Sequence, residues 1–174
     1  MTPIISHDNP INKKTAKMDL FLSQFLNNID KKGRVTLPSL FRKALPKDSK
    51  NEIILFKSLK FNSIEGCSTE RIKKIAKRVD DLDIFSDDQD DFATSIFSEI
   101  VPTKIDSEGR FLIPESLKIY SNIIKEVIFI GQGHYFQIWE PKAAVQRQKN
   151  SRERLVKEKR TLGSIITNVE KKNA

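Results

Sequence analysis

The sequence predicts an α+β protein in which two tandem β-α-β units share one core, with helices flanking them. Three observations support this prediction: a repeated ten-residue motif, the alternation of polar and apolar residues after each copy, and helical periodicity between and after the copies. The chain has 174 residues, which is enough for one domain or for two small ones that share a core.

An internal repeat organises the chain. The segment 29–38 aligns with 105–114 at an offset of 76 residues, and five of the ten positions are identical: Ile, Asp, Gly, Arg and Pro. After a two-residue gap the alignment continues through the apolar runs 52–56 and 126–130. A unit this small buries little apolar surface alone, so we expect the two copies to pair about a pseudo-twofold axis.

Each unit is expected to contain a turn, a short strand, a short helix and two further strands. Asp-x-x-Gly predicts a turn, because Asp accepts backbone N–H groups and Gly adopts a positive φ. The alternation that follows predicts a strand with arginine on one face, and proline then ends the strand and begins a helix. The expected elements are strands Arg34–Leu37 and Arg110–Ile113, helices Ser39–Leu45 and Glu115–Tyr120, strands Glu52–Phe56 and Glu126–Ile130, and last strands near Phe61–Ile64 and Tyr135–Trp139.

Helices are expected between the units and after the second one. Apolar residues recur at helical spacing from Ile72 to Val79, and Ser86 precedes Gln89 by three residues, which is typical of a capping box. Pro141 fits the first position of a C-terminal helix that runs roughly to Arg160. The expected division is a disordered N-terminal extension (1–17), a first unit (20–67), a helical spacer (68–97), a second unit (98–141) and a basic helical tail (142–174).

The charge is concentrated at the ends of the chain. The formal net charge is +8, of which residues 142–174 contribute +7 and residues 1–17 contribute +2, so the centre carries −1. Within the centre, seven aspartates fall in the acidic segment 80–91, which we expect to lie away from any phosphate-binding face. A basic tail on a neutral body is typical of nucleic-acid-binding proteins, and the alternative is a solvated tail that aids solubility.

Several classes of protein are not supported. The single cysteine, Cys67, excludes an internal disulfide, and no apolar run approaches the roughly 20 residues that span a bilayer, so we expect a soluble cytoplasmic protein. The two histidines, His7 and His134, are too scattered for a metal site, and the pair Gly131 and Gly133 lacks the third glycine of a dinucleotide fingerprint. We therefore expect no enzyme activity, no cofactor and no metal.

The repeated turn is the best functional candidate. Arg34 and Arg110 each follow a tight turn, so each guanidinium projects from a stiff scaffold and can grip phosphate or guanine edges. Lys31 and Lys32 add two cations beside Arg34, and Lys104 precedes the second turn. The turn-orienting residues are Asp30, Gly33, Asp106 and Gly109. The alternative is that the aspartates and arginines form ion pairs with a structural role only, although an Asp can also orient its Arg toward a ligand.

The chain resembles the MraZ family of bacterial transcriptional regulators at these residues. The Asp-x-x-x-Arg motif of that family occurs twice, within "DKKGRVTLPSLFRKAL" and "DSEGRFLIPESL", and the resemblance extends over about Leu20–Pro141. It implies two AbrB-like swapped-hairpin units related by a pseudo-twofold axis, sharing a small β-barrel-like core. Residues 18–22 look like the usual family start, so we expect residues 1–17 to be a dispensable extension or a misassigned start.

The resemblance also implies a function. Family members bind short direct repeats of double-stranded DNA in the promoter of the division and cell-wall gene cluster, which includes their own gene. They act in the cytoplasm, associated with the nucleoid, and assemble into rings. The motif arginines, here Arg34 and Arg110, and the basic turn residue Lys32 would contact DNA. The second turn carries Ser107 and Glu108 instead of two lysines, so we expect unequal contributions, with Glu108 facing away from phosphate. The alternative function is an oligomeric assembly or partner-binding scaffold with only non-specific DNA affinity.

Overall fold

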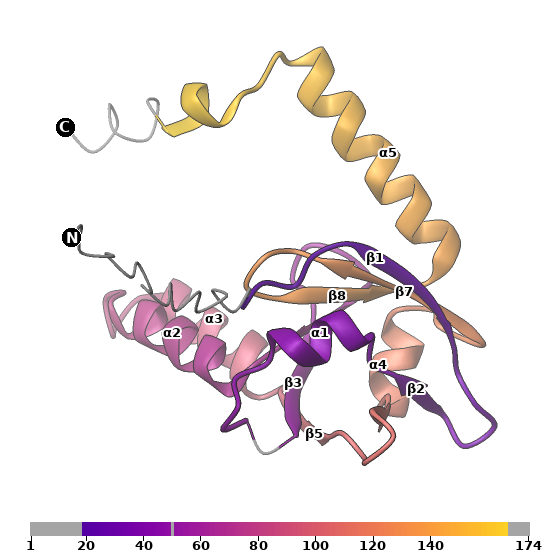
Figure 1. Cartoon of the computed structure of the whole chain (residues 1–174). Coiled ribbons are helices and arrows are strands. Elements are labelled where there is room, and N and C mark those ends of the chain that lie inside the picture. The colour runs from indigo at the N-terminus through magenta and orange to yellow at the C-terminus, as the bar shows by residue number, and fades with distance from the viewer. Residues whose placement is uncertain (1–18, 50, 167–174) are drawn as a thin grey trace, which may run out of the picture.

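The computed structural model describes residues 19–49 and 51–166 (Figure 1). In chain order the elements are β1 (Gln24–Asn28), β2 (Arg34–Thr36), α1 (Ser39–Ala44), β3 (Glu52–Lys57), β4 (Ile64–Cys67), α2 (Thr69–Asp80), α3 (Asp87–Phe97), β5 (Val101–Lys104), β6 (Arg110–Leu112), α4 (Glu115–Tyr120), β7 (Glu126–Gly131), β8 (Phe136–Trp139) and α5 (Pro141–Lys157). The N-terminal extension expected over 1–17 and the last part of the basic tail, 167–174, lie outside the described residues.

The strands form two antiparallel sheets. One has six strands in the order β1-β7-β8-β4-β3-β5, and the other is a two-stranded ribbon of β2 and β6. The protein is therefore of the α+β class, as predicted. The large sheet is open, with β1 and β5 at its edges, and the ribbon is separate from it, so the described strands do not confirm the expected barrel-like core.

The outer strands of the large sheet pair between the repeats. β1 of the first repeat pairs with β7 of the second, and β5 of the second pairs with β3 of the first. Asn28 lies opposite Glu126, and Lys104 lies opposite Glu52, which is the same pair of positions when the repeats are aligned. Each repeat thus completes the sheet of the other in the same register.

The strands near the centre pair each position with its own equivalent. In the ribbon Val35 lies opposite Phe111, and between β4 and β8 Ile64 lies opposite Ile138. A residue can lie opposite its own equivalent in two antiparallel strands only where a twofold relation passes between them. The two halves of the chain therefore follow a local twofold relation at both places.

The main core fills the space between the large sheet, the ribbon and the two short helices. Phe41 of α1 and Leu117 of α4 occupy equivalent positions in the repeat, and both are buried. Phe41 packs against Phe21 and Phe136, with ring centroids 5.3 Å apart in each case. This core lies directly beneath the ribbon, because Val35 belongs to the same buried cluster.

The opposite face of the sheet is covered by the longer helices. α2 and α3 pack over a second buried cluster that includes Cys67 and Ile96, and the start of α5 packs on Trp139. The hydroxyl of Ser86 accepts a hydrogen bond from the backbone N–H of Gln89 at 3.2 Å, so the predicted cap of α3 is confirmed. Figure 1 shows α2 and α3 at one end of the molecule and the turn before β2 at the other, which places the acidic segment far from that turn.

Two expected elements differ from the structure. The last strand of the first unit was expected near Phe61–Ile64, but β4 begins only at Ile64, because Ser58 and Ser63 close a turn with a backbone hydrogen bond of 2.9 Å. The helix expected to reach Arg160 ends at Lys157, because Lys159 adopts a positive φ of 47°, which stops the helix.

Candidate nucleic-acid interface

The turn of the first repeat, Asp30–Arg34 (the first turn), is closed by its own aspartate. Asp30 Oδ1 accepts hydrogen bonds from the backbone N–H groups of Lys32 and Arg34, at 2.8 and 2.9 Å. Gly33 has a φ of 78°, a conformation that side chains with a Cβ rarely adopt. The second turn, Asp106–Arg110, repeats this geometry, so both turns are rigid platforms for the arginine that follows.

Each arginine is held by the aspartate of its own turn. Arg34 Nε donates to Asp30 Oδ2 at 2.8 Å, and Arg110 Nε donates to Asp106 Oδ2 at 2.9 Å. The hydrogen bonds that Arg34 donates, first from its backbone N–H and then from its side chain, lower the pKa of Asp30 to about 2. The pKa of Asp106 is lowered for the same first reason, the backbone N–H of Arg110. Both carboxylates therefore stay charged and fix the direction of the guanidinium groups.

The ribbon brings the two arginines to one face. Arg34 lies opposite Leu112, and Thr36 lies opposite Arg110. These four side chains point to the outer face, because they alternate along the strands with Val35 and Phe111, which are buried beneath the ribbon. The arginines are therefore diagonal neighbours on the outer face, and such neighbours lie about 7–8 Å apart. Asp106 is the main cause of a raised pKa at Arg110, and the charge of Asp30 adds a smaller contribution, which places the two turns within electrostatic reach of each other.

The three lysines expected to bind DNA lie in different places. Lys31 and Lys32 are exposed at the tip of the first turn, next to Arg34. Lys104 is also exposed, but it ends the edge strand β5 and lies on the large sheet rather than on the ribbon. The structure thus places Lys31, Lys32 and Arg34 at one end of the ribbon and Arg110 at the other, with both arginines on the same face and Lys104 outside the ribbon.

Glu108 contacts the arginine of its own turn. Its carboxylate forms an ion pair with Arg110, with Oε2 2.6 Å from Nη1. Arg110 therefore forms ion pairs with two carboxylates, those of Asp106 and Glu108. Among the described residues, Arg34 forms an ion pair with Asp30 alone. A side chain two residues before Arg110 is within reach of its guanidinium, and the expectation that Glu108 faces away from phosphate stays a prediction.

Two further cations lie beside the turns. Arg42 of α1 donates from Nη1 to the carbonyl oxygen of Glu108 at 3.2 Å, and a Cβ added at Gly109 would overlap its guanidinium. At the other turn, a Cβ added at Gly33 would lie 3.8 Å from Lys118 Nζ. Sequence reasoning missed both residues. The repeat offset of 76 places Arg42 and Lys118 at equivalent positions, and that shared positive charge was the signal.

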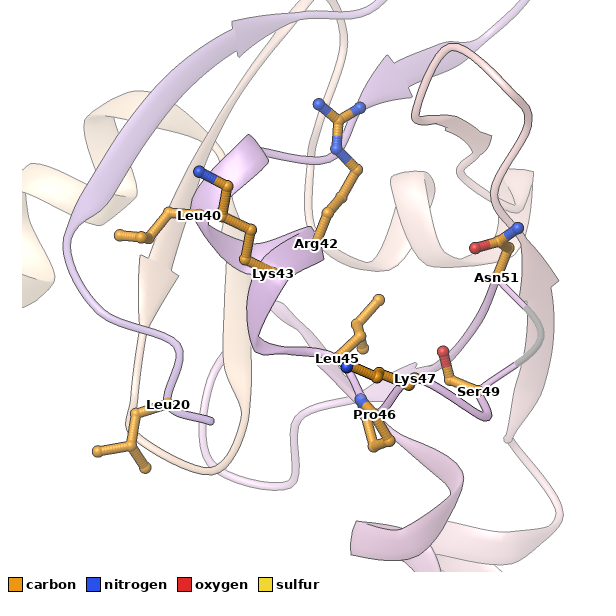
Figure 2. Close-up of a pocket in the computed structure, with 9 residues that line it drawn as sticks. All are labelled: Leu20, Leu40, Arg42, Lys43, Leu45, Pro46, Lys47, Ser49 and Asn51. Atoms are coloured by element: carbon orange, nitrogen blue, oxygen red, sulfur yellow. The ribbon is translucent and has the colours of Figure 1, made fainter. Parts of the chain in front are cut away.

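Arg42 also belongs to the rim of a shallow pocket beside α1. The pocket has a volume of about 590 Å³ and is lined mainly by α1 and the loop that follows it. Figure 2 shows the guanidinium of Arg42 pointing away from Leu45 and Pro46, which line the same pocket. The guanidinium of Arg42 therefore contacts the turn of the other repeat rather than Leu45 and Pro46 of this pocket.

Other expected properties concern metals and membranes. In the part of the chain that the structure describes, no group of three or more His, Cys, Asp or Glu side chains is placed to hold a metal ion. Over the same residues, none of the helices combines the length and the apolar character needed to span a bilayer.

Comparison with known proteins gives a consistent result. The sequence model of the family described as "MraZ protein, putative antitoxin-like" matches residues 96–163. Proteins named "Transcriptional regulator MraZ" are similar over most of the chain. The one from Rickettsia bellii is 43% identical over 125 residues, covering 71% of this chain and 83% of the relative. That of Pelagibacter ubique is 42% identical over 135 residues, covering 78% and 87%. That of Rickettsia rickettsii is 36% identical over 143 residues, covering 82% and 95%. These relatives bear the name of a regulator and not that of an enzyme.

Proposed function

The chain belongs to the MraZ family, and from this premise we propose that it is a transcriptional regulator that binds double-stranded DNA through the outer face of the β2–β6 ribbon. One observation carries the proposal: Arg34 and Arg110 share that face, each fixed by its own aspartate. A two-stranded ribbon fits the major groove of B-DNA, and a held guanidinium can contact guanine or phosphate with two N–H groups.

The charge of the first turn supports phosphate contact there. Lys31 and Lys32 are exposed beside Arg34, with Lys118 close to Gly33. Each cation that neutralises a phosphate releases counterions, so binding should weaken as salt rises. Lys104 lies on the neighbouring sheet edge, and we assign it a peripheral phosphate contact rather than a base contact.

The finer parts of the function follow from the family. We propose that the two repeats (20–67 and 98–141) are AbrB-like swapped-hairpin units, which the pairing of β1 with β7 and of β5 with β3 supports. We further propose that the protein recognises direct repeats upstream of the division and cell-wall gene cluster, including its own gene. Such a regulator works in the cytoplasm with the nucleoid.

The experiment is a footprint on a labelled fragment from upstream of the protein's own gene, with a titration against a scrambled fragment of equal length. We expect protection of short repeats and tighter binding to the native fragment. Arg34→Ala and Arg110→Ala should each weaken binding to the protected site by about 10- to 100-fold, the cost of losing a specific arginine contact. Equal affinity of wild type and both variants would reject the assigned face.

Self-association into a ring is the second part of the proposal. The loop between α2 and α3 exposes Phe85 (90%) and Ile84 among aspartates, whereas α5 carries six cations and one glutamate and exposes Val145 and Val156. In Figure 1 α5 extends away from the sheet. The two surfaces are complementary in charge and both are partly apolar, which supports a head-to-tail contact between copies.

The alternative function is a scaffold with non-specific DNA affinity only. The exposed apolar residues of the α2–α3 loop favour it, because they suit a protein partner as well as a second copy. The same titration separates the two functions. A scaffold would bind native and scrambled fragments equally, and its affinity would depend on salt alone.

A further inference from the structure

The two turns differ in sequence at two positions, and at one of them the charge is reversed. At the repeat offset of 76, Lys32 of the first turn is equivalent to Glu108 of the second. The first turn holds three cations and one carboxylate, a formal charge of +2, whereas the second holds one cation and two carboxylates, a formal charge of −1. Two turns with the same backbone geometry therefore present opposite charges.

The carboxylate of Glu108 contacts the guanidinium of Arg110, which is the group that DNA would contact. It lies 2.6 Å from Arg110 Nη1, while Asp106 Oδ2 accepts from Nε at 2.9 Å. These two acceptors engage two of the three guanidinium nitrogens. For a phosphate or a base to bind Arg110 with two N–H groups, Glu108 has to move away or share the guanidinium.

The contact is open to competition. The side chain of Glu108 is 65% exposed, so water screens its attraction to Arg110, and exposed ion pairs of this kind are weak. Asp106, in contrast, is tied to the turn by two backbone N–H groups. A DNA acceptor can therefore displace Glu108 without disturbing the turn.

We propose that Glu108 is an internal competitor that pairs with Arg110 in the DNA-free protein and lowers the affinity of the protein for any duplex that does not displace it. This inference rests on the proposed DNA-binding function and names the residue that makes its two halves unequal. The first turn, with Lys32 in the equivalent place, anchors to phosphate, and the second turn engages only against the competition of Glu108. Because Glu108 competes with every DNA acceptor that binds Arg110 weakly, it reduces binding to DNA of unrelated sequence.

The test measures binding of the full chain to a mixed-sequence duplex by fluorescence anisotropy between about 50 and 200 mM salt. Glu108→Gln should tighten binding by about 3- to 10-fold at the lower salt and steepen the salt dependence by about one phosphate contact. The matched control is Glu70→Gln, which removes the same charge from exposed α2 and should change the affinity by less than about twofold.

A double-variant cycle separates competition from simple repulsion. In an Arg110→Ala background, Glu108→Gln should give no gain, because no guanidinium is left to release. A gain of the same size in both backgrounds would overturn the proposal, since it would mean that Glu108 only repels phosphate. An unchanged affinity of Glu108→Gln with a binding wild type would also overturn it, while leaving the DNA-binding function standing.

A measurement without DNA checks the contact itself. The Nη1–H resonance of Arg110, assigned through its loss in Arg110→Ala, should shift in Glu108→Gln and stay in place in Glu70→Gln. An unmoved resonance would overturn the proposal. If the wild-type protein binds neither this duplex nor the upstream fragment, the DNA-binding function fails and this inference fails with it.

Discussion

Val35 and Phe111, which occupy equivalent positions of the repeat, lie opposite each other at the centre of the β2–β6 ribbon, and both are buried. The residues on either side of this pair, Arg34 and Arg110 among them, point to the outer face. The pair therefore attaches the ribbon to the main core, which leaves the arginines on the opposite, outer face. Packing beneath the ribbon and chemistry above it depend on the same three residues in each strand.

Phe111→Ala should lower the free energy of unfolding by about 3–5 kcal/mol, because it removes a large side chain that is fully enclosed and leaves a cavity. The control is the neighbouring residue: Leu112→Ala removes an exposed side chain from the outer face and should change the stability by less than about 0.5 kcal/mol. Urea unfolding followed by far-UV circular dichroism measures both. Similar losses in the two variants would contradict the inward and outward assignment of β6.

The stability of the protein should fall as the pH is lowered and Asp30 of the first turn becomes protonated. The pKa of Asp30 is lowered from 3.8 to about 2, chiefly by the hydrogen bond from the backbone N–H of Arg34. A carboxyl group whose pKa is lower in the folded state stabilises that state above its unfolded pKa, and this contribution is lost as the pH falls toward the folded pKa. The window is therefore from about pH 5 down to pH 2.

Thermal unfolding of the wild type and of Asp30→Asn over this window measures the effect. The difference in Tm between them should be largest near neutral pH and shrink toward pH 2, because the wild-type carboxyl becomes neutral there. A carbon-detected NMR titration of the Asp30 carboxyl gives the pKa directly. A value near 4, with a constant Tm difference, would contradict the role of the turn hydrogen bonds.

Much of the repeat architecture could be predicted from local sequence. Asp-x-x-Gly followed by alternation placed β2 and β6 to within one residue, and Glu115–Tyr120 is α4 as expected. These elements are fixed by residues close in the chain, because the turn aspartate bonds to the next few backbone N–H groups. The start of β4 was misplaced by three residues, since the loop of Ser58–Ser63 has no proline or glycine to mark its end.

The contacts between the repeats could not be read in the same way. Arg42 reaches the carbonyl of Glu108 across 66 residues of sequence, and no local pattern reports such a contact. The ion pair of Glu108 with Arg110 was missed for a different reason. The charges were visible in the sequence, but the geometry of the turn decides whether the two side chains contact each other.

Gly33→Ala should destabilise the protein by about 1–2 kcal/mol, because Gly33 has a φ of 78° and a Cβ is strained in this conformation. Gly163→Ala is the matched control: a Cβ there meets no atom within 4 Å, and residue 163 has no positive φ. Its stability should stay the same or rise slightly. Chemical denaturation of both variants tests this, and equal stability of Gly33→Ala and wild type would show that the turn tolerates a side chain.

The proposed contact between copies predicts that Phe85→Ser lowers the oligomer mass. Phe85 is almost fully exposed within the α2–α3 loop, so its loss should not affect folding but should remove apolar area from the contact. The control is Ile119→Ser, which changes an exposed apolar residue on α4, away from this loop. Sedimentation velocity distinguishes them. A mass distribution of Phe85→Ser equal to that of the wild type would assign self-association to another surface.

Cys67 should be unreactive in the native protein at mildly alkaline pH. Burial beneath α2 raises the pKa of its thiol from 9.0 to about 12, so the reactive thiolate is scarce while the fold persists. A thiol-reactive dye should label the protein slowly in buffer and rapidly in urea. Because the pKa is higher in the folded state, stability should also decline as the pH rises above about 9, and Cys67→Ala should lose that decline. Rapid labelling in buffer at the rate of the unfolded chain would show that α2 opens away from the sheet.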